Sequence, residues 1–353
     1  MKLSEIGEFG LISRIAQDCH FGDPCRILKG IGDDAAVVCV GNEALVVTTD
    51  LMVERVHFVR GDIPPYQLGY KSIAVSLSDI AAMGAAPLDI YVSIAVPEAV
   101  PLEEVDAIFC GMKDLARATA TNLLGGDTTA SRQDLVINSA ITGTAKPEEI
   151  LYRHAAQPGD VILVSGELGD SAGGLYVARH RPDIAQQSAE RLLLAHYQPA
   201  LYLREARLLA SSGQAHAGID LSDGLSSDLG HICRASNCGA EISATALPIS
   251  NALQDLCRNA KLDPLQFALS GGEDYRLLVT VHPAAAARLL ALISQETGRQ
   301  FYVIGRITTG SSIILRRADG SAMPVGPSGY DHFHRPNTQA SPIVLPMKTG
   351  DLS

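Results

Sequence analysis

Strand-like and helix-like segments alternate along this chain in two successive series, and the alternation constrains the fold more than any other feature. In the first series the apolar runs VVCV, ALVVTTD, DIYVSIAVP and LVINSAITGTA predict strands, and residues 64–85 and 100–120 predict amphipathic helices. A polar stretch with two prolines, residues 146–160, separates them from a second series that opens with the strand VILVSG. We therefore predict a two-domain α/β (α+β) protein, with domains at 1–146 and 147–336. Residues 337–353 lack periodicity and predict an extended or disordered tail.

Composition and charge exclude several classes of protein. The chain of 353 residues is long enough for two cores, and no run approaches the roughly 18 apolar residues of a membrane span. Its net charge of −11 argues against binding nucleic acid. Glu5 and Glu8 lie where a signal peptide would have a basic flank followed by an apolar core. We therefore expect a cytoplasmic protein without a membrane partner.

The segment GIGDDAA, residues 30–36, matches the dinucleotide pattern G-x-G-x-x-A but not its context. A strand-like run follows it where that pattern needs a helix, and Asp33 and Asp34 would repel a phosphate directly. A phosphate-binding loop of the type G-x-x-x-x-G-K-[ST] is also absent, because Tyr70 precedes Lys71 in GYKS. Any phosphorylated ligand is therefore expected to bind together with a cation.

Aspartates recur where the chain leaves a predicted strand or enters a glycine-rich turn. Each could serve alone as a turn former or helix cap, but the set is compatible with a metal site. Asp220 and Asp223 are three apart, so we expect them on one face of a first helical turn, where two charges near 4 Å repel by about 4 kcal/mol at an effective dielectric of 20. Asp79 lies inside an apolar helix, where an unpaired carboxylate is costly. Such oxygen ligands suit Mg²⁺. The aspartates at strand ends and turns are Asp34, Asp50, Asp127, Asp220 and Asp223.

Eight ordered motifs resemble those of the bacterial thiamine-monophosphate kinases, within the superfamily typified by aminoimidazole ribonucleotide synthetase. The resemblance runs from residue 7 to about residue 334, nearly the whole chain. The motifs are GIGDDAAVV, TTDLMVERVHF, YKSIAVSLSDIAAMGAAP, LLGGDTT, RHAAQPGDVILVSGELGDSAGGL, GIDLSDGLSSDLGHI, ALSGGEDY and GYDHF.

The resemblance implies particular ligands for particular residues. It implies several Mg²⁺ ions held by Asp34, Thr48, Thr49, Asp50, Asp79, Asp127, Asp220 and Asp223. It implies ATP contacts at Gly126, Asp127, Arg153 and Ser222, and contacts with the thiamine phosphate at His57, Glu273 and Tyr330. It also implies a homodimer in which the N-terminal sheets of two subunits pair.

The function that follows is ATP-dependent phosphorylation of thiamine monophosphate to thiamine diphosphate. We expect direct, Mg²⁺-assisted in-line transfer without a catalytic protein base. Two alternatives stay open: another ATP-using enzyme of the superfamily acting on a different phosphorylated or amide substrate, and a catalytically silent protein that binds nucleotide or metal. The role of Asp33 is open, and GELGDSAGGL fits either a loop that packs a helix closely or a phosphate cradle.

Overall fold

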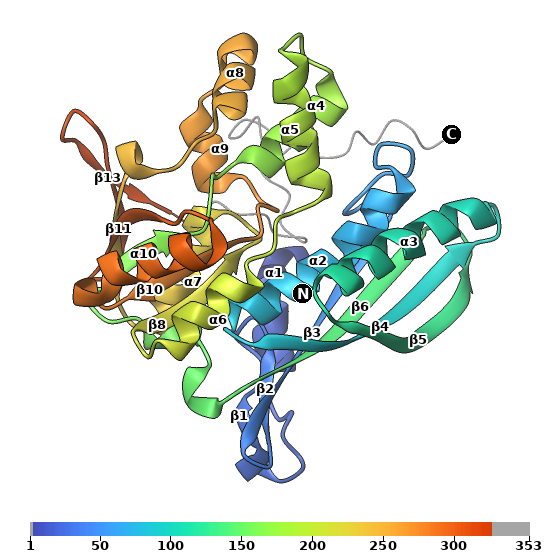
Figure 1. Cartoon of the computed structure of the whole chain (residues 1–353), viewed down its shortest axis with the longest axis horizontal. Helices are drawn as coiled ribbons and strands as arrows, with labels where there is room; N and C mark the ends of the chain where they lie inside the picture. The colour runs from blue at the N-terminus through green and yellow to red at the C-terminus, as the bar shows by residue number, and fades with distance from the viewer. Residues whose placement is uncertain (1–2, 327–353) are drawn as a thin grey trace.

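Two β-sheets organise the chain in the computed structural model, which describes residues 3–326 (Figure 1). Tyr330 and the predicted tail at 337–353 lie outside the described residues. The first sheet has the strand order β1-β2-β3-β6-β4-β5, and all its pairs are antiparallel except β4–β5. Its strands are β1 (Ile27–Lys29), β2 (Ala36–Val40), β3 (Glu43–Val53), β6 (Val136–Ala145), β4 (Ala86–Pro97) and β5 (Asn122–Ser131).

The second sheet has seven strands in the order β13-β12-β9-β11-β7-β10-β8. Only the β12–β9 pair is parallel among the described strands of this sheet. The strands are β13 (Ala322–Val325), β12 (Ile313–Arg316), β9 (Gly239–Ser243), β11 (Tyr302–Thr308), β7 (Val161–Val164), β10 (Arg276–Val281) and β8 (Ala215–Leu221). The predicted two-domain α/β fold is confirmed.

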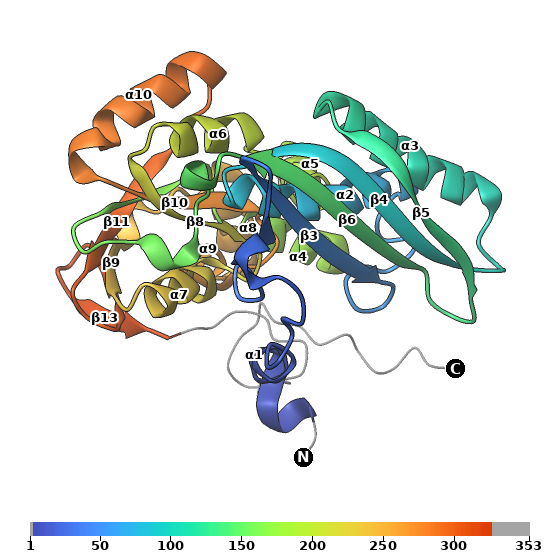
Figure 2. The same ribbon diagram turned by 90° about the horizontal axis from the view of Figure 1, so that it is seen from below.

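Helices cover the sheets and form a separate group beside them (Figures 1 and 2). Helices α2 (Pro65–Ala82) and α3 (Leu102–Ala118) pack on one face of the first sheet. Helices α6 (Leu203–Ser211) and α10 (Ala286–Thr297) cover one face of the second sheet, and α7 (Leu225–Ala235) covers the other. The remaining group comprises α4 (Asp170–His180), α5 (Gln186–Tyr197), α8 (Asn251–Ala260) and α9 (Pro264–Ser270). Near the N-terminus lies α1 (Leu3–Ile15), and single 3₁₀ turns occupy η1 (Pro24–Arg26), η2 (Pro147–Glu149), η3 (Arg153–Ala155), η4 (Ala244–Ala246) and η5 (Pro283–Ala285).

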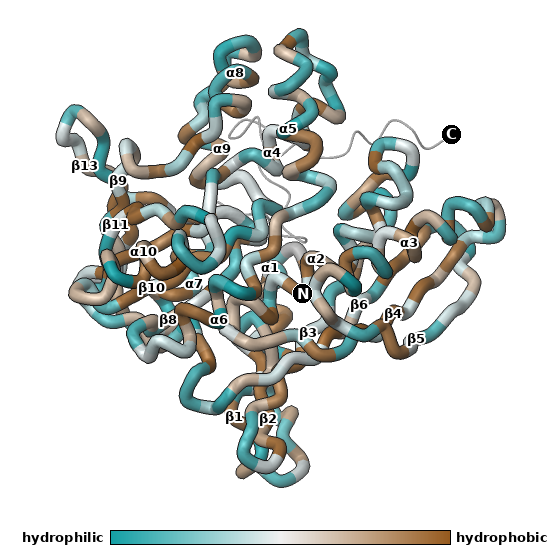
Figure 3. Tube along the Cα trace, in the orientation of Figure 1, coloured by the Kyte–Doolittle hydropathy of each residue, from teal (hydrophilic) through white to brown (hydrophobic). Residues whose placement is uncertain are grey.

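Hydrophobic segments follow the strands of both sheets, whereas hydrophilic and hydrophobic residues alternate along α4 and α8 (Figure 3). This distribution follows from burial, because sheet faces covered by helices exclude water. Among the described residues, no helix combines the length and the apolar character needed to cross a membrane.

Helix α2 joins the two domains. Its C-terminal alanines, Ala81 and Ala82, share a core with Leu151 and Leu209 of the second domain. The approach is close: a Cβ on Gly218 of β8 would lie 2.5 Å from the Ala82 carbonyl oxygen. Side chains near the end of α2 therefore meet residues of the second sheet.

Two local expectations from the sequence are wrong. The sequence predicts a strand end or turn for the glycine-rich segment around Asp127. In the structure this segment forms edge strand β5, because it pairs in parallel with β4. Gly126 permits this pairing with a φ of 146°, since a Cβ there would lie 1.6 Å from the Val92 carbonyl oxygen. Asp220 and Asp223 do not share a helical turn: Asp220 belongs to β8, and α7 begins only at Leu225.

Candidate active site

Carboxylates from both domains meet at the junction made by α2. Asp79 comes from α2, Asp220 from the end of β8, and Asp34 from the loop before β2. One oxygen from each of these three lies within 4.8 Å of the other two. Asp50 is on the inner face of β3 and accepts a hydrogen bond from Ser76 of α2 (2.6 Å). We name Asp34, Asp50, Asp79 and Asp220 the acidic cluster.

Hydroxyl groups hold the acidic cluster in place. Because side chains alternate along a strand, Thr48 and Asp50 of β3 both point toward α2. Ser76 and Ser78, two residues apart on α2, donate to different carboxylates. The hydroxyl contacts are Ser76 to Asp50 (2.6 Å), Ser78 to Asp220 (2.7 Å) and Thr48 to Asp79.

Burial raises the pKa of Asp79 well above the usual range, and the neighbouring carboxylates Asp50, Asp220 and Asp34 raise it further. Burial likewise raises the pKa of Asp220, with Asp34 as the next cause, and the pKa of Asp50. Close carboxylates that resist ionisation need a cation to be charged together. Carboxylate and hydroxyl oxygens are ligands that Mg²⁺ prefers, so the donor set fits this ion.

These raised pKa values predict a pH dependence of stability without divalent cation. A carboxyl whose pKa is higher in the folded than in the unfolded protein stabilises the fold below its unfolded pKa of about 3.9, and this contribution is lost as pH rises through the folded pKa. Asp79→Asn removes the titrating group. In a chelator, its melting temperature is therefore expected to rise relative to wild type between pH 4 and pH 8. A difference that stays constant or reverses over this range would contradict the assignment.

Arg153 of η3 neutralises part of this charge. Its Nε and Nη2 atoms donate to the two oxygens of Asp34 at 3.1 and 2.8 Å. Asp33 turns the other way: it pairs with Lys29 at 3.1 Å and accepts the Arg153 backbone N–H at 3.2 Å. Asp33 therefore fixes the loop through Lys29 and Arg153, and Asp34 faces the acidic cluster.

A second group of possible ligands begins at Asp223. Asp223, Asp228 and His231 bring one ligand atom each within 4.8 Å of one another. Asp228 is buried and accepts the backbone N–H groups of Asp223 (3.1 Å) and Gly224 (3.0 Å). Asp228 therefore caps the start of α7 and fixes the loop that carries Asp223.

The structure does not bring every predicted ligand to the acidic cluster. Thr49 points to the opposite face of β3 from Thr48, and its hydroxyl accepts from Asn138 (2.8 Å). Asp127 is exposed on β5 and accepts the N–H of Thr128. Gly126 has the backbone role described above. Ser222 lies in the loop after β8, where its carbonyl accepts the Glu273 N–H (2.7 Å).

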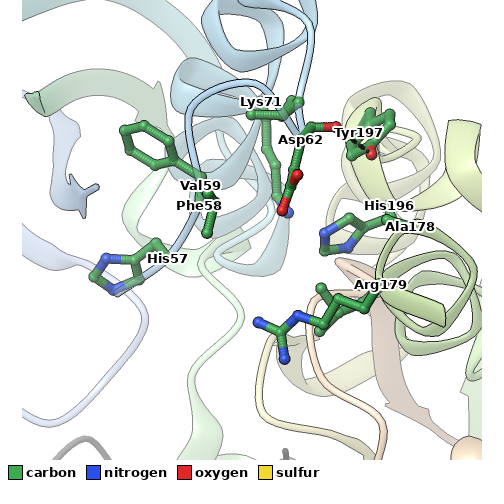
Figure 4. Close-up of a pocket in the computed structure, with 11 residues that line it drawn as sticks. His57, Phe58, Val59, Asp62, Lys71, Ala178, Arg179, His196 and Tyr197 are labelled. Atoms are coloured by element: carbon green, nitrogen blue, oxygen red, sulfur yellow. Dashed lines mark hydrogen bonds between the residues drawn. The ribbon is translucent and has the colours of Figure 1, made fainter. Parts of the chain in front are cut away.

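A basic pocket lies near the other end of α2, between α2, the loop after β3, and helices α4 and α5 (Figure 4). His57 lies on one side of it, and His196 and Arg179 lie on the other (Figure 4). The His57 Nδ1 atom accepts the Val53 N–H at 3.0 Å, which fixes the ring. We use the name basic pocket for the space lined by His57, Phe58, Val59, Asp62, Ile63, Lys71, Leu175, Ala178, Arg179, His196 and Tyr197.

Glu273 connects the basic pocket to the second domain. Its carboxylate pairs with Lys71 at 3.0 Å, and the Lys71 side chain is only 2% exposed. Burial is the largest single influence and disfavours the charged form of Glu273, but Lys71 and the nearby histidines together lower the Glu273 pKa. His196 lies 3.5 Å from Glu273 and hydrogen-bonds to Ser171 (3.1 Å). Burial, followed by Lys71, lowers the His196 pKa to about 3, so this imidazole is neutral at pH 7.

Sequence reasoning missed Lys71, Arg179 and His196. A lysine inside an apolar helix is as conspicuous as Asp79 in the same helix, so Lys71 could have been found by the same argument. Arg179 and His196 gave no such signal, because only the packing of α4 against α5 brings them to the basic pocket.

Family comparisons agree with this architecture. The model described as AIR synthase related protein, N-terminal domain, matches residues 32–145, and that described as AIR synthase related protein, C-terminal domain, matches residues 157–317. A chain of the HypE–HypF complex has the same fold at 20% identity and a TM-score of 0.70, covering 89% of this chain and 98% of that chain. The two family models together match most of the chain, which is therefore an AIR synthase related protein.

Relatives with higher sequence identity identify a particular family within this class. Thiamine-monophosphate kinase of Escherichia coli K12 is 37% identical over 94% of this chain and 99% of its own length, and that of Bacillus subtilis is 35% identical over 86% and 93%. A solved structure of AaThiL complexed with AMPPCP and TMP superposes with a TM-score of 0.81 at 30% identity, covering 94% of this chain and 99% of that chain. The chain belongs to the thiamine-monophosphate kinase family. The motif resemblance and the prediction of a kinase are thereby confirmed.

Proposed function

We propose that the chain transfers the γ-phosphoryl group of ATP to the phosphate of thiamine monophosphate and so forms thiamine diphosphate. Relatives named for this activity, and the AaThiL structure with AMPPCP and TMP, support the choice of substrates. The observation that carries the proposal is the separation of charge along α2. Lys71 in the basic pocket and Asp79 in the acidic cluster are eight residues apart, about 12 Å along the helix axis.

This separation suits a reaction between two polyanions. In the proposal, Asp34, Asp50, Asp79 and Asp220, with the Thr48 hydroxyl, hold Mg²⁺, and Asp223 extends the site toward α7. Bound Mg²⁺ would supply charge neutralisation and orientation of phosphate oxygens. We also retain Thr49 and Asp127 as proposed ligands, and Gly126, Asp127, Arg153 and Ser222 as proposed nucleotide contacts.

The basic pocket is proposed to take the acceptor. Lys71 and Arg179 provide fixed positive charge and hydrogen-bond donors for its phosphate. His57 and Glu273 orient the rest of the substrate, together with Tyr330. No protein base is needed, because the second pKa of a phosphate monoester is about 6 and the acceptor is mostly dianionic at pH 7.

Product analysis tests this function. Purified protein is incubated with ATP, Mg²⁺ and thiamine monophosphate, and thiamine diphosphate is measured by mass spectrometry. Product should appear only when all three components are present. ATP consumption without thiamine diphosphate, from folded protein, would indicate another substrate, and absence of any turnover would indicate a silent binding protein.

We propose further that domain 1–146 dimerises and binds metal and ATP, and that 147–336 forms the second domain. The face of the first sheet opposite α2 and α3 carries exposed apolar side chains: Val47, Leu51 and Tyr91 are 37%, 52% and 40% exposed. Exposed apolar clusters of this kind favour association.

The dimer predicts a clear effect of one charged residue. Leu51→Lys should yield a monomer, because the lysine is tolerated on an exposed strand but not in an apolar interface. Val303→Lys, a matched change at a 45% exposed position on β11, should leave the oligomeric state unchanged. Light scattering measures the oligomeric state of the wild type and the two variants. A monomeric wild type with full activity would contradict the proposed dimer.

A further inference from the structure

The glycine-rich segment GELGD leads into α4, and one carboxylate accepts two backbone N–H groups where the segment meets the helix. Asp274 accepts the N–H of Gly169 at 2.6 Å and the N–H of Ser171 at 3.1 Å. Asp274 is 5% exposed, and Gly169, at the N-cap of α4, has no side chain to cap the helix. Asp274 therefore supplies the cap from a distant part of the chain. Of the two interpretations of this loop, close helix packing agrees with the structure, because a Cβ on Gly174 of α4 would lie 2.1 Å from the Leu192 carbonyl oxygen of α5.

The residues on either side of Asp274 have an unusual backbone. Glu273 has a φ of 64° and Tyr275 a φ of 48°, both in the left-handed region that residues other than glycine seldom adopt. Backbone bonds from Glu273 to Ser222 (2.7 Å) and from Tyr275 to Leu221 (2.8 Å) attach this turn to the end of β8. Such a conformation persists only where the surroundings impose it.

This backbone conformation determines where the Glu273 side chain points. With the turn anchored to α4 on one side and to β8 on the other, the Glu273 carboxylate reaches Lys71 across the domain junction at 3.0 Å. His196 is fixed by the same anchor, because its Nδ1 atom lies 3.1 Å from the hydroxyl of Ser171, whose N–H is bound to Asp274.

We propose that Asp274 is a positioning residue for the basic pocket: by capping α4 it holds the turn 273–275 so that Glu273 faces Lys71. Asp274 contacts no substrate in this account and acts through Glu273. The inference rests on the proposed function, because its readout is the affinity for thiamine monophosphate.

Asp274→Asn is the informative substitution. An asparagine presents an N–H₂ group toward one of the two backbone donors, so it can accept only one of the two hydrogen bonds. The KM for thiamine monophosphate should rise about tenfold, as expected when a hydrogen-bonded charged group is misplaced, while kcat and the KM for ATP should change little. In a Glu273→Gln background the same substitution should have little further effect on this KM.

A matched control separates positioning from general loss of stability. Asp170, the first residue of α4, is also buried, but its carboxylate accepts a hydrogen bond from Ser250 (2.5 Å) and pairs with Arg191 (3.5 Å), and neither partner belongs to the turn 273–275. Asp170→Asn should lower the melting temperature without raising the KM for thiamine monophosphate. KM does not depend on the fraction of folded enzyme. A partly unfolded variant therefore still shows whether the affinity for thiamine monophosphate has changed.

Several results would overturn the positioning role. These are an unchanged KM in Asp274→Asn, full additivity with Glu273→Gln, or an equal KM increase in Asp170→Asn. If Asp274→Asn does not fold, Asp274→Ser, which keeps a smaller acceptor, replaces it, and failure of both to fold would show a purely structural role. Absence of product from wild type would instead overturn the proposed function.

Discussion

Replacing Asp220 with asparagine is expected to lower kcat by about 10³-fold, because metal-supplied charge stabilisation is worth several kcal/mol and each 1.36 kcal/mol is a factor of ten. Folding should survive. Asp220 lies close to Asp34 and Asp79, so the neutral amide relieves repulsion, and it can still accept the Ser78 hydrogen bond. The variant should therefore be at least as stable as wild type in a chelator.

Thermal melts with and without Mg²⁺ provide a readout independent of turnover. A native state that binds the ion gains stability by mass action, and Asp220→Asn should lose most of this gain. Asp160→Asn is the control: Asp160 is buried in the same domain, but it pairs with His216 (2.9 Å) outside the acidic cluster and should keep the Mg²⁺ effect. A variant that unfolds, yet retains specific activity in its folded fraction, would show that Asp220 is structural.

Glu273→Gln should lower the free energy of unfolding by about 3 kcal/mol, because it leaves the buried Lys71 ammonium without its ion-pair partner. The value is at the lower end of the range for buried pairs, since the Glu273 side chain is 29% exposed. The double variant Glu273→Gln/Lys71→Met should recover most of the loss, because the unpaired charge is then absent. Chemical denaturation of the three proteins measures these differences.

An exposed pair provides the control for this prediction. Glu296 pairs with Arg204 at 2.9 Å, and their side chains are 41% and 64% exposed. Glu296→Gln should therefore cost no more than about 1 kcal/mol. If Glu273→Gln costs as little, or if Lys71→Met fails to restore stability, the Lys71–Glu273 pair does not hold the domain junction in the way described.

The sequence predicts the acidic cluster better than the basic pocket, for physical reasons. A carboxylate within an apolar helix is costly without a partner, so Asp79 could be identified from its neighbours alone. Thr48 and Thr49 are adjacent and of the same residue type, so the motif alone does not separate them. The alternation of side chains along β3 places them on opposite faces. The basic pocket depends on how α4 and α5 pack near α2, and no local pattern encodes that placement.

The fold could be predicted in outline from the same patterns. Apolar strands such as β3 and β6 have strong local signals, as do the amphipathic helices α2 and α3. Strand β5 did not, because its glycines resemble a turn and its conformation depends on pairing with β4. The left-handed turn at Glu273 and Tyr275 also has no signal in the sequence, because tertiary contacts impose this backbone conformation on residues other than glycine.

Direct transfer between the two anions is the central claim, and the stereochemistry at phosphorus tests it most directly. The reaction is run with ATP carrying a chiral γ-thiophosphate, and the configuration of the thiophosphoryl group in the product is determined. A single in-line displacement predicts inversion. Retention would indicate two displacements through a phosphorylated residue and would contradict the account.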